Sequence, residues 1–361
     1  MNYRLSTIHA RKTYGTDTTE IIDLDMKDPI SQLIIELAVT NVTSESATAH
    51  AIASLAKIEI IDGSDVLFSL NGYEAEAVDI IHNKVMRSNW NMYLDGNDVQ
   101  RFVGINFGRY LWDKMLAFDP TRFRNPQLKL TLDVGAGGIA SVSNKLQVWA
   151  ALFDEKAISP IGFLMHKEIK DYLMSSAAHE YTDLPRDYPY RKLFIRAQVA
   201  GTEPNSIIGN IKLSEDQEKR VICNHGAQDL LRTMAAMNPA LVENIIFGGR
   251  VNGSYVFTTA TERTQATFVT FGSVTGTNVF ATYGSAGGRM AVDSGASENA
   301  IAIVRGWTPH GTYEIPFGDQ MDIDDWYDVA KVGSLRADIT AVSGIAATDY
   351  CQLFLQQLRR Y

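Results

Sequence analysis

Residues 20–39 read EIIDLDMKDPISQLIIELAV, and residues 180–199 read EYTDLPRDYPYRKLFIRAQV. The two stretches align without a gap and are identical at seven of twenty positions, whereas ordinary composition predicts about one or two identities by chance. Pro29 and Pro189 are among the identities, and each precedes an apolar run. The chain therefore contains an internal repeat, which has to be established before a fold is assigned.

Further matches follow in the same order along both halves of the chain. They pair Lys57–Ile60 with Lys212 and Leu213, Val66–Phe68 with Val221–Cys223, Gly72 with Gly226, Ile105–Gly108 with Ile315–Gly318, Leu128–Leu132 with Leu335–Ile339, Gly138–Ala140 with Gly344–Ala346, and Gln147–Trp149 with Gln352–Phe354. The distance between matching segments grows by roughly fifty residues after Gly226. One large insertion, residues 253–311, is therefore expected in the second half, and its Thr, Ser and Gly content favours hairpins on a loop.

Each half begins and ends with strands and has one helix near its middle. Bounding Pro, Gly and polar residues, together with β-branched and aromatic content, predict strands over 32–41, 146–153, 192–200 and 351–358. Apolar stripes with a period of 3.6 residues predict helices over 73–86 and 227–237. The stripes consist of Ala77, Ile80, Ile81 and Val85 in the first helix and Leu230, Leu231 and Met234 in the second. Asn224 is the expected start signal of the second helix.

These patterns predict an all-β protein with a few short helices, built as two tandem eight-stranded jelly rolls side by side. The expected division is an N-terminal arm over 1–17, a first jelly roll over 18–155, a linker over 156–179 and a second jelly roll over 180–361. Regular alternation of strands and helices is not seen, which argues against a doubly wound sheet.

The composition and motifs point away from several classes of function. A net charge of −9 disfavours general nucleic-acid binding. The first residues hold no apolar stretch of signal-peptide length, and two cysteines, Cys223 and Cys351, cannot form a disulfide framework, so folding in a reducing cytoplasm is expected. The histidines and cysteines lack metal-binding spacing, and neither a nucleophile elbow nor a Walker loop is present. No catalytic residue, cofactor or metal is therefore expected.

One acidic cluster is a candidate Ca²⁺ site. It consists of Asp319, Asp322, Asp324 and Asp325. Carboxylates in one loop are ligands that Ca²⁺ prefers, but the EF-hand order of ligands is missing. The competing interpretation is a solvated loop in which one Asp caps a short helix at 326–328. The sequence leaves the choice between these two open.

A duplicated sandwich has a use that requires no active site. Three chains around a three-fold axis place six barrels in a pseudo-hexagonal block, which tiles a surface with a single polypeptide. The paired strand runs, including residues 57–70 (KIEIIDGSDVLFSL), resemble those of the double jelly-roll major capsid proteins of tailless icosahedral viruses. This adenovirus-like lineage includes membrane-containing bacteriophages. The resemblance covers about residues 18–358 and rests on the order of elements.

The resemblance implies a homotrimeric capsomer whose strands stand roughly normal to an icosahedral virion shell. Neighbouring capsomers are then its partners, with an internal membrane and minor capsid or vertex proteins as further candidates. The protein would be made in the host cytoplasm and would reside in the virion. The insertion is expected to project as a tower on the outer face. Sequence-specific nucleic-acid binding is not expected.

Two sets of residues are candidate surfaces. The basic residues near the termini are expected to face membrane or genome, with ordinary solvated termini as the alternative; they are Arg4, Arg11, Lys12, Arg359 and Arg360. The aromatic residues Trp90, Tyr93 and Trp112 are candidates for a subunit interface, with packing inside the barrel as the alternative.

Two other classes of function remain open at this stage. One is a tandem jelly-roll enzyme acting on glycans, or a carbohydrate-binding protein, and the other is a viral spike or vertex protein. An enzyme needs carboxylates that converge in a cleft. The acids Glu20 and Asp23 recur as Glu180 and Asp183, and this duplication favours a structural role.

Overall fold

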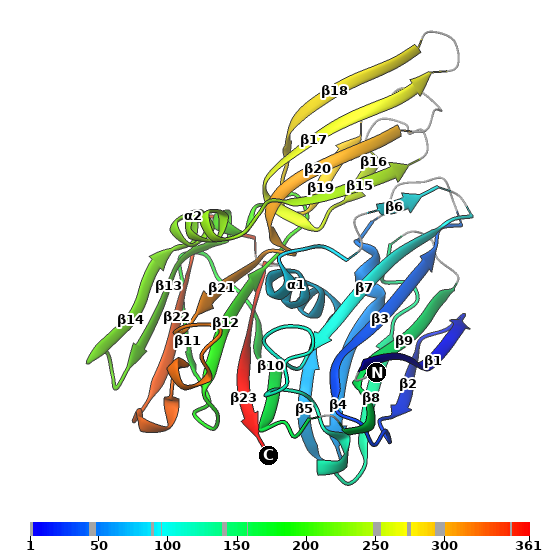
Figure 1. The fold of residues 1–361 in the computed structure, drawn as a ribbon. Coiled ribbons are helices and arrows are strands. Elements are labelled where there is room, and N and C mark those ends of the chain that lie inside the picture. The colour runs from blue at the N-terminus through cyan, green and yellow to red at the C-terminus, as the bar shows by residue number, and fades with distance from the viewer. Residues whose placement is uncertain are drawn as a thin grey trace.

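The computed structural model describes residues 3–42, 48–87, 90–94, 96–138, 143–156, 158–247, 254–272, 276–292, 300–346 and 349–361. Strands make up most of these residues, together with helices α1 (Gly72–Asn83) and α2 (Ala227–Met237) (Figure 1). Short 3₁₀ turns are η1 (Ala51–Ser54), η2 (Pro120–Arg122), η3 (Asp154–Lys156), η4 (Pro204–Ser206), η5 (Ile323–Asp325) and η6 (Val329–Lys331). The described helices all fall short of the length and apolarity that a membrane crossing requires.

The first half of the chain forms a sandwich of two four-stranded layers. Its strands are β1 (Tyr3–Tyr14), β2 (Thr18–Asp23), β3 (Ile30–Thr40), β4 (Leu55–Asp62), β5 (Asp65–Leu70), β7 (Asp98–Asn106), β8 (Pro126–Leu132) and β9 (Asn144–Phe153). One layer has the order β1-β9-β3-β7 and the other has the order β2-β8-β4-β5. Successive strands alternate between the layers at both ends of the segment, which is the connectivity of a jelly roll.

The second half repeats this arrangement. Its strands are β10 (Gly162–Leu173), β11 (His179–Asp183), β12 (Tyr190–Ala197), β13 (Ile208–Glu215), β14 (Arg220–Gly226), β21 (Thr312–Pro316), β22 (Leu335–Ala341) and β23 (Tyr350–Arg360). The layers are β10-β23-β12-β21 and β11-β22-β13-β14, the same order as in the first half, strand by strand. The described strands therefore form two tandem eight-stranded jelly rolls, as the sequence predicts.

The pairing register confirms the internal repeat at the level of single residues. Ile34 lies opposite Trp149 on β9, and its counterpart Phe194 lies opposite Phe354 on β23, where the two rings stack with centroids 5.1 Å apart. Leu33 likewise faces Ile105, as Leu193 faces Ile315. The sequence matches along these strands thus identify residues in equivalent positions.

The match between Leu128–Leu132 and Leu335–Ile339 is wrong by two residues. Glu20 on β2 faces Leu130, and its counterpart Glu180 on β11 faces Ile339, so Leu130 corresponds to Ile339. The sequence alignment had paired Leu130 with Ala337. A shift of two residues leaves every side chain on the same face of a strand, so an alternating pattern cannot detect it.

The strand sequences explain their burial. On β8 the residues Leu128, Leu130 and Leu132 are buried while the intervening polar residues are partly exposed, the alternation typical of a layer with one face on the core. Strand β3 lies between β9 and β7, and both of its faces are largely covered, which fits its nearly continuous apolar sequence.

Helix α1 ends earlier than predicted, and α2 has the predicted bounds but not the predicted cap. Asn71 and Glu74 form a capping box at the start of α1. The helix ends at Asn83, followed by Lys84 in the left-handed region, so Val85 lies outside the helix and is exposed. Helix α2 spans the predicted 227–237, but Asn224 belongs to β14 and does not cap it.

Two expected boundaries also change. Residues 3–14, expected in a free N-terminal arm, form β1 and pair along β9 from Tyr3 to Tyr14. Gly162–Leu173, expected in a linker, form β10 and pair along β23. Both strands carry charged residues on their outer sides, and this polar composition conceals strands at the edge of a layer.

The insertion forms a sheet of its own. Its strands are β15 (Leu241–Phe247), β16 (Ser254–Phe257), β17 (Ala260–Gly272), β18 (Gly276–Ser285), β19 (Arg289–Val292) and β20 (Ala300–Pro309). The larger sheet has the order β18-β17-β20-β15-β6, and β6 (Trp90–Tyr93) is contributed by the first half in parallel to β15. This tower projects beyond both barrels, away from the C-terminus (Figure 1). It begins at Leu241, earlier than expected, and Gly253 lies outside the described residues.

Candidate functional site

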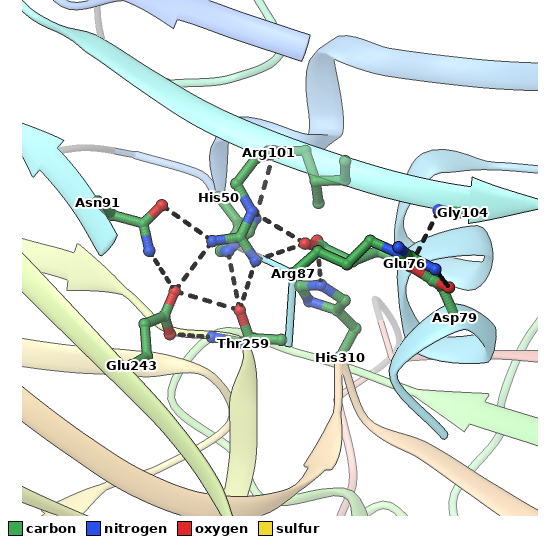
Figure 2. A network of polar contacts seen from close by, with 11 residues as sticks. His50, Glu76, Asp79, Arg87, Asn91, Arg101, Gly104, Glu243, Thr259 and His310 are labelled. Carbon is green, nitrogen blue, oxygen red and sulfur yellow. Dashed lines mark hydrogen bonds and ion pairs between the residues drawn. The ribbon is translucent and has the colours of Figure 1, made fainter. Parts of the chain in front are cut away.

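A buried polar network lies where the first barrel, α1 and the tower meet (Figure 2). At its centre is Arg101 on β7, whose side chain is fully buried. Its Nε donates to Oε1 of Glu76 on α1 at 3.0 Å, and its Nη1 donates to Oε1 of Glu243 on β15 at 3.0 Å. One guanidinium thus pairs with carboxylates from two separate elements. Although burial opposes its charge, Glu76 and Glu243 raise the pKa of Arg101 above its ordinary value.

Two neutral side chains complete the hydrogen bonds around Glu243. Asn91 on β6 donates to Glu243 Oε1 at 2.6 Å and accepts from Arg101 Nη1 at 3.0 Å. The backbone N–H of Thr259 donates to Glu243 Oε2 at 2.9 Å, and its hydroxyl accepts from Arg101 Nη2 at 2.8 Å. A buried charge is tolerated when it is paired and fully hydrogen bonded, and this carboxylate meets both conditions.

Two buried histidines border the network on the side of Glu76. Nε2 of His310 lies 2.8 Å from Glu76 Oε2, and the rings of His310 and His50 meet edge to face at 4.8 Å. Nδ1 of His50 accepts the N–H of Ile52 at 3.2 Å, so the proton of the neutral ring lies on Nε2. Burial lowers the pKa of both histidines well below its ordinary value, which keeps the two rings neutral.

The trio His50, Glu76 and His310 has the ligand types of a Zn²⁺ site, with ligand atoms within 4.8 Å of one another. Metal-binding histidines donate their second ring N–H to an acceptor, which orients the free nitrogen toward the metal. In His50 the second nitrogen is itself an acceptor, and the guanidinium of Arg101 lies against Glu76. The donor set therefore fits a hydrogen-bonded structural junction better than a metal centre.

A second buried carboxylate continues the junction along α1 (Figure 2). Asp79 accepts from Nε of Arg87 at 2.5 Å, from the N–H of Gly104 at 2.9 Å and from Asn106 Nδ2 at 2.9 Å. Burial raises the pKa of Asp79. Helix α1 is thus held to β7 by two acids one turn apart, and these buried groups offer no surface to a substrate.

The basic residues near the termini fall into two separate groups. Arg4 pairs with Asp28 and Asp154 beside the start of β10, where Arg360 also lies. We call this end, opposite the tower, the base. Arg11 and Lys12 lie at the other end of β1, about 25 Å away at the rise of a strand.

Each of these basic residues already has an acidic neighbour. Arg11 pairs with Glu36 and Asp98, Lys12 with Glu20, and Arg359 with Asp65, while Arg360 lies 3.7 Å from Asp324. The five residues therefore do not form one cluster, because strand β1 holds Arg11 and Lys12 away from Arg4. That they face membrane or genome stays a prediction. The three residues near the base, Arg4, Arg359 and Arg360, are called the base arginines below.

The three candidate interface aromatics have different environments. Tyr93 is buried in the main core, so it is not available to a partner in the isolated chain. Trp112 is half-buried and lies between Tyr3, at 4.5 Å, and Phe153, at 5.5 Å between ring centroids. Trp90 belongs to β6, and its side chain lies outside the described residues.

The aspartate loop uses its carboxylates on its own backbone. Asp319 accepts from the N–H of Met321, Asp322 from the N–H of Asp324, and Asp325 from the N–H of Asp319. Asp322 caps η5, which begins three residues before the short helix that the sequence predicts. These bonds agree with the interpretation of a capped, solvated loop.

The duplicated acids occupy equivalent structural places in the two barrels. Glu20 pairs with Lys12 and Glu180 with Lys170, so each barrel repeats an ion pair between its first two strands. Strands β2 and β11 end different sheets, so the acids do not converge on one cleft. Of the two cysteines, Cys351 is fully buried, and burial raises its pKa to about 12.

Comparison with solved structures places this fold among viral proteins. The structure is similar to the major capsid protein of Sulfolobus Turreted Icosahedral Virus, with a TM-score of 0.62 and 10% sequence identity. The matched region covers 99% of this chain and 97% of that protein. The fold of this chain is that of viral major capsid proteins. The same 99% matches 98% of the major capsid protein P2 of bacteriophage PM2 (TM-score 0.56, 11% identity). It also matches 94% of VP54 of PBCV-1 as fitted into the virophage Sputnik (TM-score 0.59, 12% identity). No family model and no curated relative matches the sequence.

Sequence reasoning missed the buried junction. Glu76, Arg101 and Glu243 come from three distant segments, and none of them stands in a recognisable motif. One signal was available, because Glu76 and Asp79 interrupt the apolar face of α1 three residues apart. Buried acids on the inner face of a short helix require a cation from elsewhere in the fold.

Proposed function

We propose that this protein is the major capsid protein of an icosahedral virus, acting as a homotrimeric, pseudo-hexagonal capsomer. The observation that carries the proposal is the duplicated jelly roll, matched strand by strand in both halves, which gives one chain two equivalent barrels. The similarity to capsid proteins over nearly the whole length of both chains supports it. Three such chains present six barrels, which pack as hexagons in a shell.

The two ends of the molecule support an orientation in that shell. The tower lies at one end, and the C-terminus lies at the other (Figure 1). We place the tower outside and the base inside, toward genome, internal membrane or minor capsid proteins. The base also exposes apolar side chains on neighbouring loops, which suits contact with a lipid surface or a partner. They are Tyr110, Leu111, Met115, Ile161 and Met321.

The proposal assigns residues 3–153 to the first barrel and 162–360 to the second, with the tower inserted between α2 and β21. Assembly places the protein in the virion after synthesis in the host cytoplasm. A glycan-active enzyme or lectin is not favoured, because the duplicated acids Glu20 and Glu180 are engaged in separate ion pairs.

The test is the oligomeric state of the purified chain and its assemblies. Native mass spectrometry should show a species of three times 40.0 kDa, and electron microscopy should show hexagonal arrays or closed shells. A chain that stays monomeric at high micromolar concentration and forms no array would contradict the proposed function. Cleavage of a glycan substrate by that monomer would support the enzyme alternative.

A further inference from the structure

The two barrels of one chain meet through a short parallel pairing of β5 with β10. Phe68 pairs with His166 and Ser69 with Lys167. The rings of Phe68 and His166 are 5.4 Å apart, and both side chains are buried. This contact fuses a layer of each barrel into one eight-stranded sheet. The fifth strand of one barrel thus docks on the first strand of the next.

The internal repeat leaves the complementary edges unused. Strand β14 is the equivalent of β5, and β1 is the equivalent of β10. Among the described residues, β14 pairs only with β13 and β1 only with β9, so each ends its layer. Open edges present unpaired backbone groups that another chain is able to extend. The edges that would continue the intrachain junction are therefore available in every copy.

The pairing registers fix which residues would meet. Phe68 faces Ile60 on β4, as Cys223 faces Leu213 on β13, so Cys223 takes the place of Phe68. On the other side, His166 faces Gln356 on β23, and Leu5 faces Ala151 on β9. Gln356 and Ala151 each lie two residues beyond the equivalent pair Phe354 and Trp149. Leu5 therefore takes the place of His166.

The exposed fractions of these residues show that the open edge of an isolated chain lacks the cover that the intrachain junction has. His166 is 1% exposed at the intrachain junction, whereas its equivalent Leu5 is 64% exposed on the open edge. Val221, next to the edge position of Cys223, is also exposed. An exposed leucine on the outer strand of a layer is the apolar contact that a docked strand would cover.

A charge pair across the junction gives an independent argument. Arg359 of the second barrel forms an ion pair with Asp65 of the first. Arg220 is the equivalent of Asp65, since each directly precedes the matched valines of β14 and β5. Asp154 is the equivalent of Arg359, since each lies five residues beyond the equivalent pair Trp149 and Phe354. Both signs are reversed, so attraction is preserved between copies.

We propose that β14 of one copy lies parallel to β1 of a second copy, with Cys223 opposite Leu5 and Arg220 facing Asp154. This inference rests on the proposed trimeric capsomer and names its subunit contact. The contact is head to tail, because different edges meet, and such contacts either close into rings or grow without limit. Three repeats close the ring, in which intrachain and interchain junctions alternate around six barrels.

Cysteine crosslinking tests the register. The Leu5→Cys variant under mild oxidation should form covalent dimers and trimers through native Cys223 on a non-reducing gel. The double variant Leu5→Cys, Cys223→Ser should form none. Ile21→Cys is the matched control, because Ile21 is also an exposed aliphatic residue on an edge strand, β2, and should form no ladder with Cys223.

Charge reversal tests the second contact. Arg220→Asp alone and Asp154→Arg alone should each lower the trimer fraction at least tenfold at a fixed concentration, and the double variant should restore it. A wild-type trimer without crosslinks or charge rescue overturns this contact and leaves the proposed function standing. A ladder that continues past the trimer overturns ring closure. A wild-type chain that is monomeric overturns the proposed function itself.

Discussion

Replacing Arg101 with Met tests whether the buried network holds the tower, α1 and the first barrel together. The variant keeps the aliphatic volume but leaves the buried carboxylates of Glu76 and Glu243 without their shared cation. Breaking a buried ion pair by removing one partner destabilises a protein by about 3–5 kcal/mol. We expect the free energy of unfolding at pH 7.5 to fall by about that amount, since both carboxylates lose their cation together.

Urea unfolding at 25 °C measures this loss, and hydrogen exchange along β15 shows whether the tower opens first. The difference in free energy of unfolding between the wild type and the variant should become smaller toward pH 5. Unpaired buried carboxylates have raised pKa values, so the folded variant binds protons that the unfolded chain does not bind at that pH. Adding Glu76→Gln and Glu243→Gln should recover much of the loss. Arg336→Met, in an exposed pair with Asp183, is the control and should change little. A loss below about 1 kcal/mol for Arg101→Met, the size seen for surface pairs, would refute the reasoning.

Three further perturbations follow from the same structure. Burial, followed by the charge of Glu168, raises the pKa of Glu74 to about 8. The contribution of protonated Glu74 to the free energy of unfolding is therefore complete below about pH 4.5 and is lost as the pH rises through 8. Glu74→Gln should remove from the pH dependence of the free energy of unfolding a slope of about 1.4 kcal/mol per pH unit, measured by urea titrations. A Cβ at Gly72 would lie 2.6 Å from the carbonyl oxygens of Ile52 and Leu55, so Gly72→Ala should cost about 1–3 kcal/mol in thermal unfolding, whereas Gly226→Ala meets only ordinary contacts and should be neutral. Changing the base arginines to Gln should reduce co-sedimentation with anionic vesicles. Unchanged co-sedimentation would contradict the prediction that the base contacts lipid.

The repeat is the part of the fold that the sequence alone could predict. Pro29 and Pro189 fix the entry to the third strand of each barrel, and the residues after them pair in the same register. Such positions combine a backbone restriction with a buried side chain, so both copies retain them. The first strand of each barrel was not predicted, because β1 and β10 place charged residues outward and have no apolar alternation to detect.

The buried junction was beyond the sequence for a different reason. Its members are brought together by the tower, whose strand β15 pairs with β6 from the other half of the chain. A pairing of segments so far apart leaves no local period in the sequence. Only the acids on the apolar face of α1 indicate that a buried polar junction exists, and they do not identify the basic residue with which they pair.

The junction also marks where the two halves ceased to be equivalent. In the second barrel the place of Glu76, five residues after the N-cap of α1, is taken by Leu231 on α2, and that of Arg101 by Gly311, directly before β21. The charged pair therefore exists only where the tower sheet docks on the first barrel, and the second barrel keeps an apolar helix contact instead. At the open edges the two halves differ but stay complementary. The intrachain pair Asp65–Arg359 has the equivalents Arg220 and Asp154, in which both charges are reversed. The two halves differ without such matching inside the chain, whereas the charge changes at the two open edges compensate each other. Contact between these edges in neighbouring copies would select such compensation.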